Sequence, residues 1–227
     1  YALKKAEDAQ RAYAAYNLDK PEIRGAYEVF APGQLDLVIQ NKKFTLDPKS
    51  SKKNINLITK YVQNTKFKDL PNLPGPLKSK DFILKLIKAE SNWNPRAVSS
   101  AKAWGLGQFK AFARQDLADK RDPDFDAFNA MKSINGIPQY LGLVQNYITE
   151  KNKKNKYAKA MWDVASDDEK ARIILYAYQQ GVGGGWGEIA NKIGASVVAG
   201  AILPTDHRAM LDTYFQNRTK FYEKYRS

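Results

Sequence analysis

The sequence predicts a mainly helical protein. Ile83 and Ile87 precede Glu90 by seven and three residues, which is the spacing of side chains on one face of a helix. An alternation of apolar and polar residues, as in strands, is confined to residues 35–47. Hydrophobic residues make up 43% of the 227 residues, as in packed globular proteins. We therefore expect a helical core with little sheet.

Residues 1–75 are expected to form a mostly helical N-terminal accessory segment. Three prolines and one glycine between residues 70 and 76 cannot continue a helix or strand, so we place a domain boundary there. An ordered proline loop on the surface of one domain is the alternative. The expected elements are helices at residues 2–15, 21–30 and 55–62, and a small hairpin at 35–47 that turns through Asn41-Lys42-Lys43.

Residues 76–227 are expected to form the main domain. Ser79 is placed to cap the helix that ends at Glu90. Ser166 and Glu169 have the spacing of a capping box, and Gly181 stops the helix that they begin. Further helices are predicted at residues 109–119, at 126–148 with an interruption at Gly136-Ile137-Pro138, and at 206–225.

Composition removes several classes of chemistry. The chain has no cysteine and one histidine, His207, so it lacks a Cys nucleophile, thiolate metal sites and multi-histidine zinc sites. His207 follows Thr205 and Asp206 at an expected helix start, which favours a surface or capping role over a catalytic triad. We expect no metal and no cofactor.

The net charge of +13 favours a polyanionic partner. Nucleic acid, anionic lipid headgroups and bacterial wall polymers all fit that description. The lysines are scattered, and the group at residues 151–156 has no interleaved aromatic residue, so we do not expect a nucleic-acid groove. The glycine run at 181–187 follows a helix instead of a strand, which argues against nucleotide binding.

Glu90 is the candidate general acid. It lies on the apolar face of its helix, where a carboxyl group should be poorly solvated. Desolvation raises the pKa of a carboxyl group, and a glutamic acid that stays protonated near neutral pH can donate a proton to a glycosidic leaving group. The alternative is that Glu90 is a charged side chain at the helix end that points into solvent and has no catalytic role.

The candidate binding residues surround Glu90 in sequence or end a second helix. Gly105 and Gly107 make the following loop compact, although a tight connection between helices also explains them. Gln108 offers both a donor and an acceptor to a sugar acetamido group. Trp104 and Tyr178 have aromatic faces that suit sugar rings, with core packing as the alternative for both.

Several residues match the pattern of one family at the same time. They are Glu90-Ser91, Asn94-Pro95, Ala97, Ser99, Ala103, Gly105-Leu106 and Gln108, followed by Asp122-Pro123, Gly136, Tyr140-Leu141, Ala177-Tyr178 with Gly181, and Arg218 with Tyr222. This pattern resembles the soluble lytic transglycosylase family over about residues 77–225. The sequence departs from it at Gly107, where the family usually has Met, and at Gln179-Gln180, which replace Asn-Ala.

The resemblance implies a lysozyme-like catalytic domain of the α+β lysozyme superfamily, preceded by the N-terminal extension. The family cleaves the β-1,4 bond between N-acetylmuramic acid and N-acetylglucosamine in peptidoglycan and leaves 1,6-anhydromuramoyl ends. Glu90 would be the catalytic acid. The substrate-binding residues would be Ser91, Ser99, Trp104, Gly107, Gln108 and Tyr178.

The motif holds one glutamate and no neighbouring aspartate, which agrees with substrate-assisted catalysis. Glu90 would act first as acid and then as base. We expect a soluble monomer that binds peptidoglycan glycan strands in the cell envelope or periplasm, or as a secreted or virion-associated protein, with protein partners in the envelope or virion. Because the chain starts at Tyr1, a removed leader or anchor stays open.

Three rival functions stay open at this point, and one of them, a nucleic-acid binder, is supported by the net charge alone. A goose-type lysozyme would hydrolyse the same bond on a related fold. A non-catalytic wall-binding or assembly protein of a phage particle or secretion system would keep the groove without the reaction.

Overall fold

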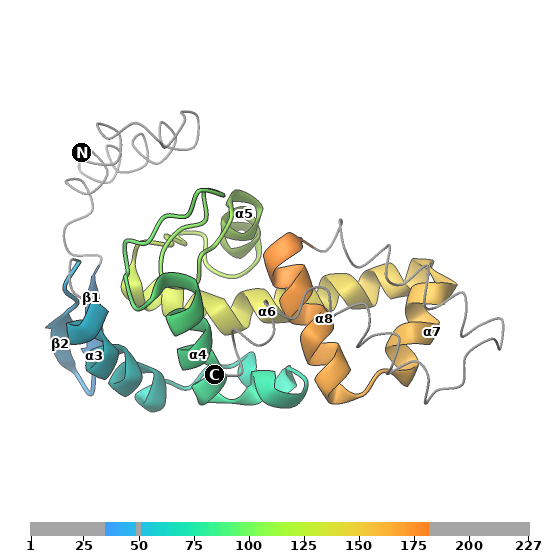
Figure 1. Ribbon diagram of the computed structural model, residues 1–227, viewed down its shortest axis with the longest axis horizontal. Coiled ribbons are helices and arrows are strands. Elements are labelled where there is room, and N and C mark those ends of the chain that lie inside the picture. The colour runs from blue at the N-terminus through green and yellow to red at the C-terminus, as the bar shows by residue number, and fades with distance from the viewer. Residues whose placement is uncertain (1–34, 49–50, 182–227) are drawn as a thin grey trace. The chain divides into compact units, whose positions relative to one another are not determined.

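The computed structural model describes residues 35–48 and 51–181, and these are mainly helical (Figure 1). They divide into two compact units. The first unit contains the described residues up to Thr65 together with Glu90–Gly136, and the second contains Lys66–Ala89 together with the described residues from Ile137 onward. Helices α4 and α6 each contribute residues to both units.

The first unit begins with the predicted hairpin. Strands β1 (Asp36–Ile39) and β2 (Lys42–Thr45) pair antiparallel. Gln40 and Asn41 form the loop, with φ angles of 48° and 61°, which is the left-handed geometry of a two-residue hairpin turn. The turn thus begins at Gln40, one residue earlier than the predicted start at Asn41. Leu37 and Ile39 are buried while Val38 is exposed, so one face of the hairpin packs inward.

Helix α3 (Ser51–Asn64) packs against β1, and the predicted helix at residues 55–62 is confirmed within it. Its inner face holds Ile58 and Val62, both completely buried. The Tyr61 hydroxyl donates to Asn135 Oδ1 at 3.2 Å. Helix α3 is therefore attached both to the hairpin and to a residue of the later chain.

The rest of the first unit is a long loop after α4, helix α5 (Ala111–Lys120), a second loop at residues 121–129 and the start of α6 (Ala130–Lys154). Figure 1 shows the two loops in green beside α5. Two aromatic pairs join the loops: Phe109 meets Phe125 edge to face at 5.3 Å, and Trp104 stacks on Phe128 at 5.1 Å.

In the second unit, the proline-rich segment forms two short 3₁₀ helices, η1 (Leu70–Asn72) and η2 (Gly75–Lys78). Helix α4 (Lys80–Ser91) follows. The Ser79 hydroxyl accepts the Phe82 N–H at 3.0 Å, which confirms the predicted cap. Helix α7 (Lys156–Val164) connects α6 to α8, and η2 packs against α8.

Helix α8 (Asp167–Gln180) has the predicted boundaries. The Ser166 hydroxyl accepts the Glu169 N–H at 3.3 Å, and a Glu169 carboxylate oxygen accepts the Ser166 N–H at 2.7 Å. Gly181 ends the helix with a φ of 83°, which glycine adopts without steric cost. The apolar stripe is buried; it consists of Ala171, Ile174, Leu175 and Tyr178.

The expected interruption of α6 was wrong. The helix starts at Ala130, because the preceding residues form a loop, and it continues through Pro138 without a break. A proline inside a helix costs about 3 kcal/mol through the lost hydrogen bond and a ring clash. Ile134, Ile137 and Leu141 are completely buried around it, and burying such side chains contributes about 1.5–3 kcal/mol each, which offsets that cost.

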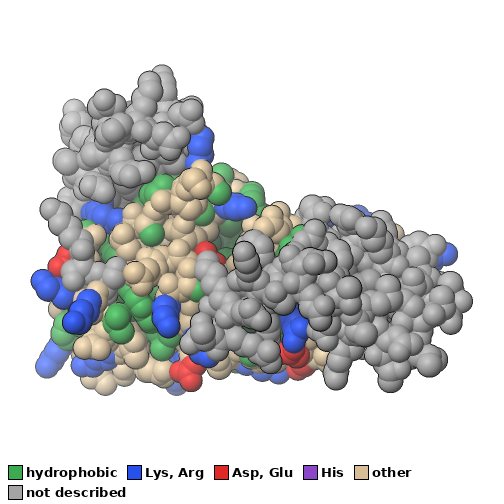
Figure 2. All heavy atoms as spheres, viewed as in Figure 1, with side chains coloured by type: hydrophobic (Ala, Val, Ile, Leu, Met, Phe, Trp, Pro, Cys, Tyr) green, Lys and Arg blue, Asp and Glu red, His purple; other side chains and the backbone are tan. Residues whose placement is uncertain are grey.

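Lysine and arginine side chains are scattered over the described part of the face drawn in Figure 2, in keeping with the positive net charge. No helix in the described part of the chain is both long and apolar enough to cross a membrane. Several expectations fall outside the described residues. These are the helices at residues 2–15, 21–30 and 206–225, the glycine run beyond Gly181, His207, Arg218 and Tyr222.

Candidate active site

Glu90 is the next-to-last residue of α4 and belongs to the first unit. Ile83 and Ile87 on the same stripe are completely buried, whereas Glu90 itself is partly exposed. The apolar stripe therefore leads up to the carboxylate. Ser91, which ends the helix, is buried, so the backbone that carries Glu90 is anchored within the protein.

The loop after α4 folds back on itself through two short bridges. Trp104 pairs with Val98 on one side and with Phe109 on the other. Ser99 closes the tip, since its hydroxyl accepts the Ala103 N–H at 3.1 Å and its own N–H donates to the Ala103 carbonyl at 3.0 Å. The Ser99 side chain thus stabilises the loop, and it is partly exposed.

Gln108 holds the loop from within. Its Nε2 donates to the carbonyls of Ala97 at 3.0 Å and Gly105 at 2.9 Å. These two bonds use both amide hydrogens, so the carbonyl oxygen is the part of the amide left for a ligand. Gln108 has a φ of 51°, a left-handed conformation that is uncommon for a residue with a side chain.

The glycines let the loop lie directly against the neighbouring loop at residues 121–129. A Cβ atom on Gly105 would lie 1.8 Å from the Ala127 carbonyl oxygen, and the φ of Gly105 is +72°. The Gly107 N–H donates to the buried Ser133 hydroxyl at 3.4 Å. The backbone of residues 105–107 is therefore held by α6 and by the loop before it.

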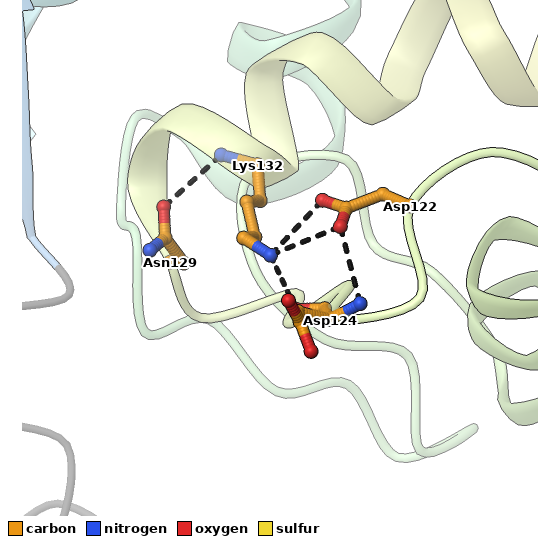
Figure 3. A network of polar contacts seen from close by, with 4 residues as sticks. All are labelled: Asp122, Asp124, Asn129 and Lys132. Atoms are coloured by element: carbon orange, nitrogen blue, oxygen red, sulfur yellow. Dashed lines mark hydrogen bonds and ion pairs between the residues drawn. The ribbon is translucent and has the colours of Figure 1, made fainter.

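Lys132 fixes that second loop (Figure 3). Its ammonium contacts the two Asp122 carboxylate oxygens at 3.0 and 3.1 Å and donates to the Asp124 carbonyl at 2.6 Å. The Asp122 carboxylate also accepts the Asp124 N–H at 3.1 Å, and Asn129 Oδ1 accepts the Lys132 N–H at 3.1 Å. The Lys132 side chain, on the first turn of α6, thereby binds both Asp122 and Asp124 and stabilises the turn between them.

Trp104 is a buried residue, with 1% of its surface exposed. Phe128 stacks against it, and the Arg114 guanidinium lies 3.6 Å from its ring centroid. The same arginine donates to the Phe109 carbonyl at 2.7 Å. The indole is thus packed against protein groups, and a direct contact of Trp104 with substrate stays a prediction.

Tyr178 belongs to the second unit, on α8. Its side chain is buried, and its ring meets Tyr140 edge to face with centroids 5.3 Å apart. The other six predicted site residues lie in the first unit, within 19 residues of sequence: Glu90, Ser91, Ser99, Trp104, Gly107 and Gln108.

The described residues contain no group of three or more His, Cys, Asp or Glu side chains that could hold a metal ion. The loop at residues 92–110 contains no aspartate or glutamate. A partly exposed carboxylate at a helix end, followed by a loop braced through its own backbone, is an arrangement that can transfer a proton to and from a bound ligand.

A family model described as the transglycosylase SLT domain matches residues 77–193. The chain belongs to this family. The resemblance seen in the sequence is thereby confirmed, and so is the fold class, since the SLT domain is lysozyme-like and the described residues are mainly helical with one small sheet. SLT domains are transglycosylase enzymes that act on peptidoglycan outside the cytoplasm. No curated protein and no solved structure matches the chain.

All seven predicted site residues of the SLT protein lie inside the matched range. Sequence reasoning did not single out Lys132, which holds the loop at residues 121–129, or Asn54, whose Nδ2 donates to the Trp93 carbonyl at 3.2 Å. The Asn129 to Lys132 spacing is that of a helix cap, which was the available signal for the start of α6. Nothing local indicated that Lys132 would reach Asp122, or that Asn54 would contact the loop after Glu90.

Proposed function

We propose that the protein is a peptidoglycan lytic transglycosylase that uses Glu90 as its single acid and base. It cleaves the β-1,4 bond between N-acetylmuramic acid and N-acetylglucosamine and forms 1,6-anhydromuramoyl ends. The observation that supports this most is the position of Glu90 within the SLT match, at the end of a buried helical stripe and before a loop that has no second carboxylate.

The reaction balances without an added nucleophile. Glu90 donates its proton to the glycosidic oxygen as the bond to the muramoyl C1 breaks. The acetamido oxygen of the same sugar stabilises the positive charge at C1. The Glu90 carboxylate then removes the proton of the muramoyl C6 hydroxyl, whose oxygen bonds to C1. The carboxyl is protonated again, and no water is consumed.

The remaining predicted residues are proposed to bind the glycan strand. Ser91, Ser99 and Gln108 provide hydroxyl and amide groups near Glu90 in the chain, and Gly107 provides a position without a side chain. Trp104 and Tyr178 complete the proposed set. Residues 1–75 are proposed as an accessory segment of a catalytic domain at 76–227, and the protein as a monomer of the cell envelope, a secretion apparatus or a virion.

The test is Glu90→Gln, which keeps the shape of the side chain but cannot donate and accept a proton in turn. Purified sacculi are digested with the parent and the variant, and the released muropeptides are analysed by mass spectrometry. We expect anhydromuramoyl products from the parent and a loss of at least about 10³-fold in rate from the variant.

Glu150→Gln is the matched control, because Glu150 is exposed and pairs with the exposed Lys153 on the surface of α6. It should digest sacculi like the parent. If Glu90→Gln clears sacculi as fast as the parent, Glu90 is not the acid. Reducing muramic ends from the parent would instead indicate a lysozyme-type hydrolase, and binding without products would indicate a wall-binding protein.

A further inference from the structure

The backbone immediately after Glu90 is strained. Asn92 and Trp93 have φ angles of 48° and 65°, and the Asn94 N–H closes the turn on the Ser91 carbonyl at 3.0 Å. Asparagine tolerates the left-handed region, but for a bulky residue such as tryptophan it costs about 1–2 kcal/mol. Trp93 is buried. Its surroundings must therefore impose this turn at the end of α4.

Asn54 of α3 contacts the strained turn. Its side chain is 1% exposed, and its Nδ2 donates to the Trp93 carbonyl at 3.2 Å. The same amide is held on its other edge by Asp47: Oδ1 accepts the Asp47 N–H at 2.8 Å, and Nδ2 donates to the Asp47 carbonyl at 2.8 Å. The donor that reaches Trp93 is thus fixed by the chain that follows β2.

We propose that Asn54 is a positioning residue for Glu90, acting through the Trp93 carbonyl. This rests on the proposed role of Glu90 as the acid and base. Trp93 follows Glu90 by three residues, so a change in the turn alters the last turn of α4 and the direction of the carboxylate. Small displacements of a reacting group have large effects, about 10²-fold in rate for 1 Å.

Asn54 lies outside the residues matched by the SLT family model, which begin at residue 77. Asp47, Asn54 and Trp93 all belong to the first unit, together with Glu90. The accessory segment of the chain therefore supplies a part of the catalytic machinery that the SLT motif itself does not contain.

Asn54→Asp and Asn54→Ala test the proposal. Aspartate keeps the volume and can still accept the Asp47 N–H, but an ionised carboxylate has no hydrogen to donate to the carbonyls of Trp93 and Asp47. Alanine removes the side chain without adding a charge. We expect kcat on soluble glycan strands to fall by about tenfold or more, with little change in KM, because substrate contacts stay in place while the acid is misdirected.

Tyr61→Phe is the matched control. It removes a hydrogen bond of the same helix, also 3.2 Å long, that goes to Asn135 instead of the turn. Each variant is assayed well below the midpoint of its own thermal transition. Hydrogen exchange of residues 91–97 should become faster in the Asn54 variants and stay as in the parent in Tyr61→Phe, since the Asn94 N–H reports the turn.

The outcomes separate this proposal from the proposed function. Activity of Glu90→Gln equal to the parent would refute the acid assignment, whatever the Asn54 variants do. If Glu90→Gln is inactive but folded Asn54 variants keep the parental kcat, the positioning role is wrong and the function stands. Equal losses of kcat in the Asn54 and Tyr61 variants would also overturn the positioning role, and so would failure of both Asn54 variants to fold. In either case Asn54 would act only on stability.

Discussion

The carbonyl oxygen of Ala127 lies 1.8 Å from the point that a Cβ atom on Gly105 would occupy. The two loops of the first unit therefore touch backbone to backbone. Because Gly105 also has a φ of +72°, any side chain there meets both a collision and a left-handed conformation. This contact sets the position of the segment that leads to Gln108.

We expect Gly105→Ala to lower the free energy of unfolding by at least about 2 kcal/mol, from overpacking and backbone strain together. Activity on sacculi should also fall, because Ala127 and residue 105 can separate only if the loop shifts. Denaturant unfolding measures the first effect, and the rate of muropeptide release from folded protein measures the second.

Gly142→Ala is the matched control for this substitution. Gly142 lies within α6, and the atom nearest to its added Cβ would be Asp69 Oδ1 at 3.6 Å, an ordinary contact. Alanine there should stabilise the protein by about 0.5–1 kcal/mol, since glycine is a poor helix former. Equal stability of the two variants would contradict the proposed collision at Gly105.

Lys132→Met should loosen the loop that carries Ala127. The change removes the ion pair with Asp122 and the bond to the Asp124 carbonyl (Figure 3). Because both side chains are about 30% exposed, with values of 29% and 32%, we expect a loss of only about 1 kcal/mol. We expect activity to fall by more than this loss of stability alone would cause, because Ala127 of this loop lies against Gly105.

A double-mutant cycle checks the pairing. Asp122→Asn should cost much less when Lys132 is already Met, whereas additive losses would show that the two side chains do not act together. Lys120→Met is the control, since Lys120 pairs with Asp116 four residues earlier in the same helix, α5. This variant should keep the parental activity, and its free energy of unfolding should change by no more than about 0.5 kcal/mol.

Asp36 should make the hairpin sensitive to acid. Hydrogen bonds from Lys43 and Thr45 lower the pKa of the Asp36 carboxyl below its ordinary value of 3.8. A lowered pKa in the folded state means that the unfolded chain takes up the proton first. The stabilisation is therefore complete above the ordinary value and is lost as the pH falls through the folded value.

Asp36→Asn removes this dependence. Urea unfolding of the parent and the variant should be compared across pH. Near neutrality their free energies of unfolding should differ by at most about 1 kcal/mol. This difference should shrink toward zero as the pH falls below the ordinary carboxyl pKa of 3.8. Because the Lys43 side chain is 68% exposed, added salt should weaken the difference as well. A difference that is the same at neutral and acid pH would count against the ion pair as its cause.

The parts of the fold that could be predicted from the sequence are those with local signals. The capping box of Ser166 and Glu169 and the Ser79 cap depend on residues three positions apart, and Gly181 ends its helix through its own φ. Glu90 was selected as the candidate acid by the combination of a helical stripe and a family pattern, and its role stays a prediction. These signals need no knowledge of the distant chain.

The missed features depend on distant partners. Asn54 and Trp93 are 39 residues apart, and Tyr61 and Asn135 are 74 apart, so no local pattern relates them. Pro138 was misread for a similar reason, because the burial of its neighbours in the folded protein outweighs its local preference to break a helix. Trp104 could be assigned to the loop but not to its packing partners.

The contacts of α3 bear on how this protein can be divided. A fragment that starts at residue 77, where the SLT match begins, would keep Glu90 and lose the donors of Asn54 and Tyr61, together with the bond from the Val38 N–H to the Met131 sulfur. The first unit therefore includes α3 and the hairpin, which lie before the residues matched by the family model. Gene fusions and chimeras of this enzyme should therefore be joined before the hairpin.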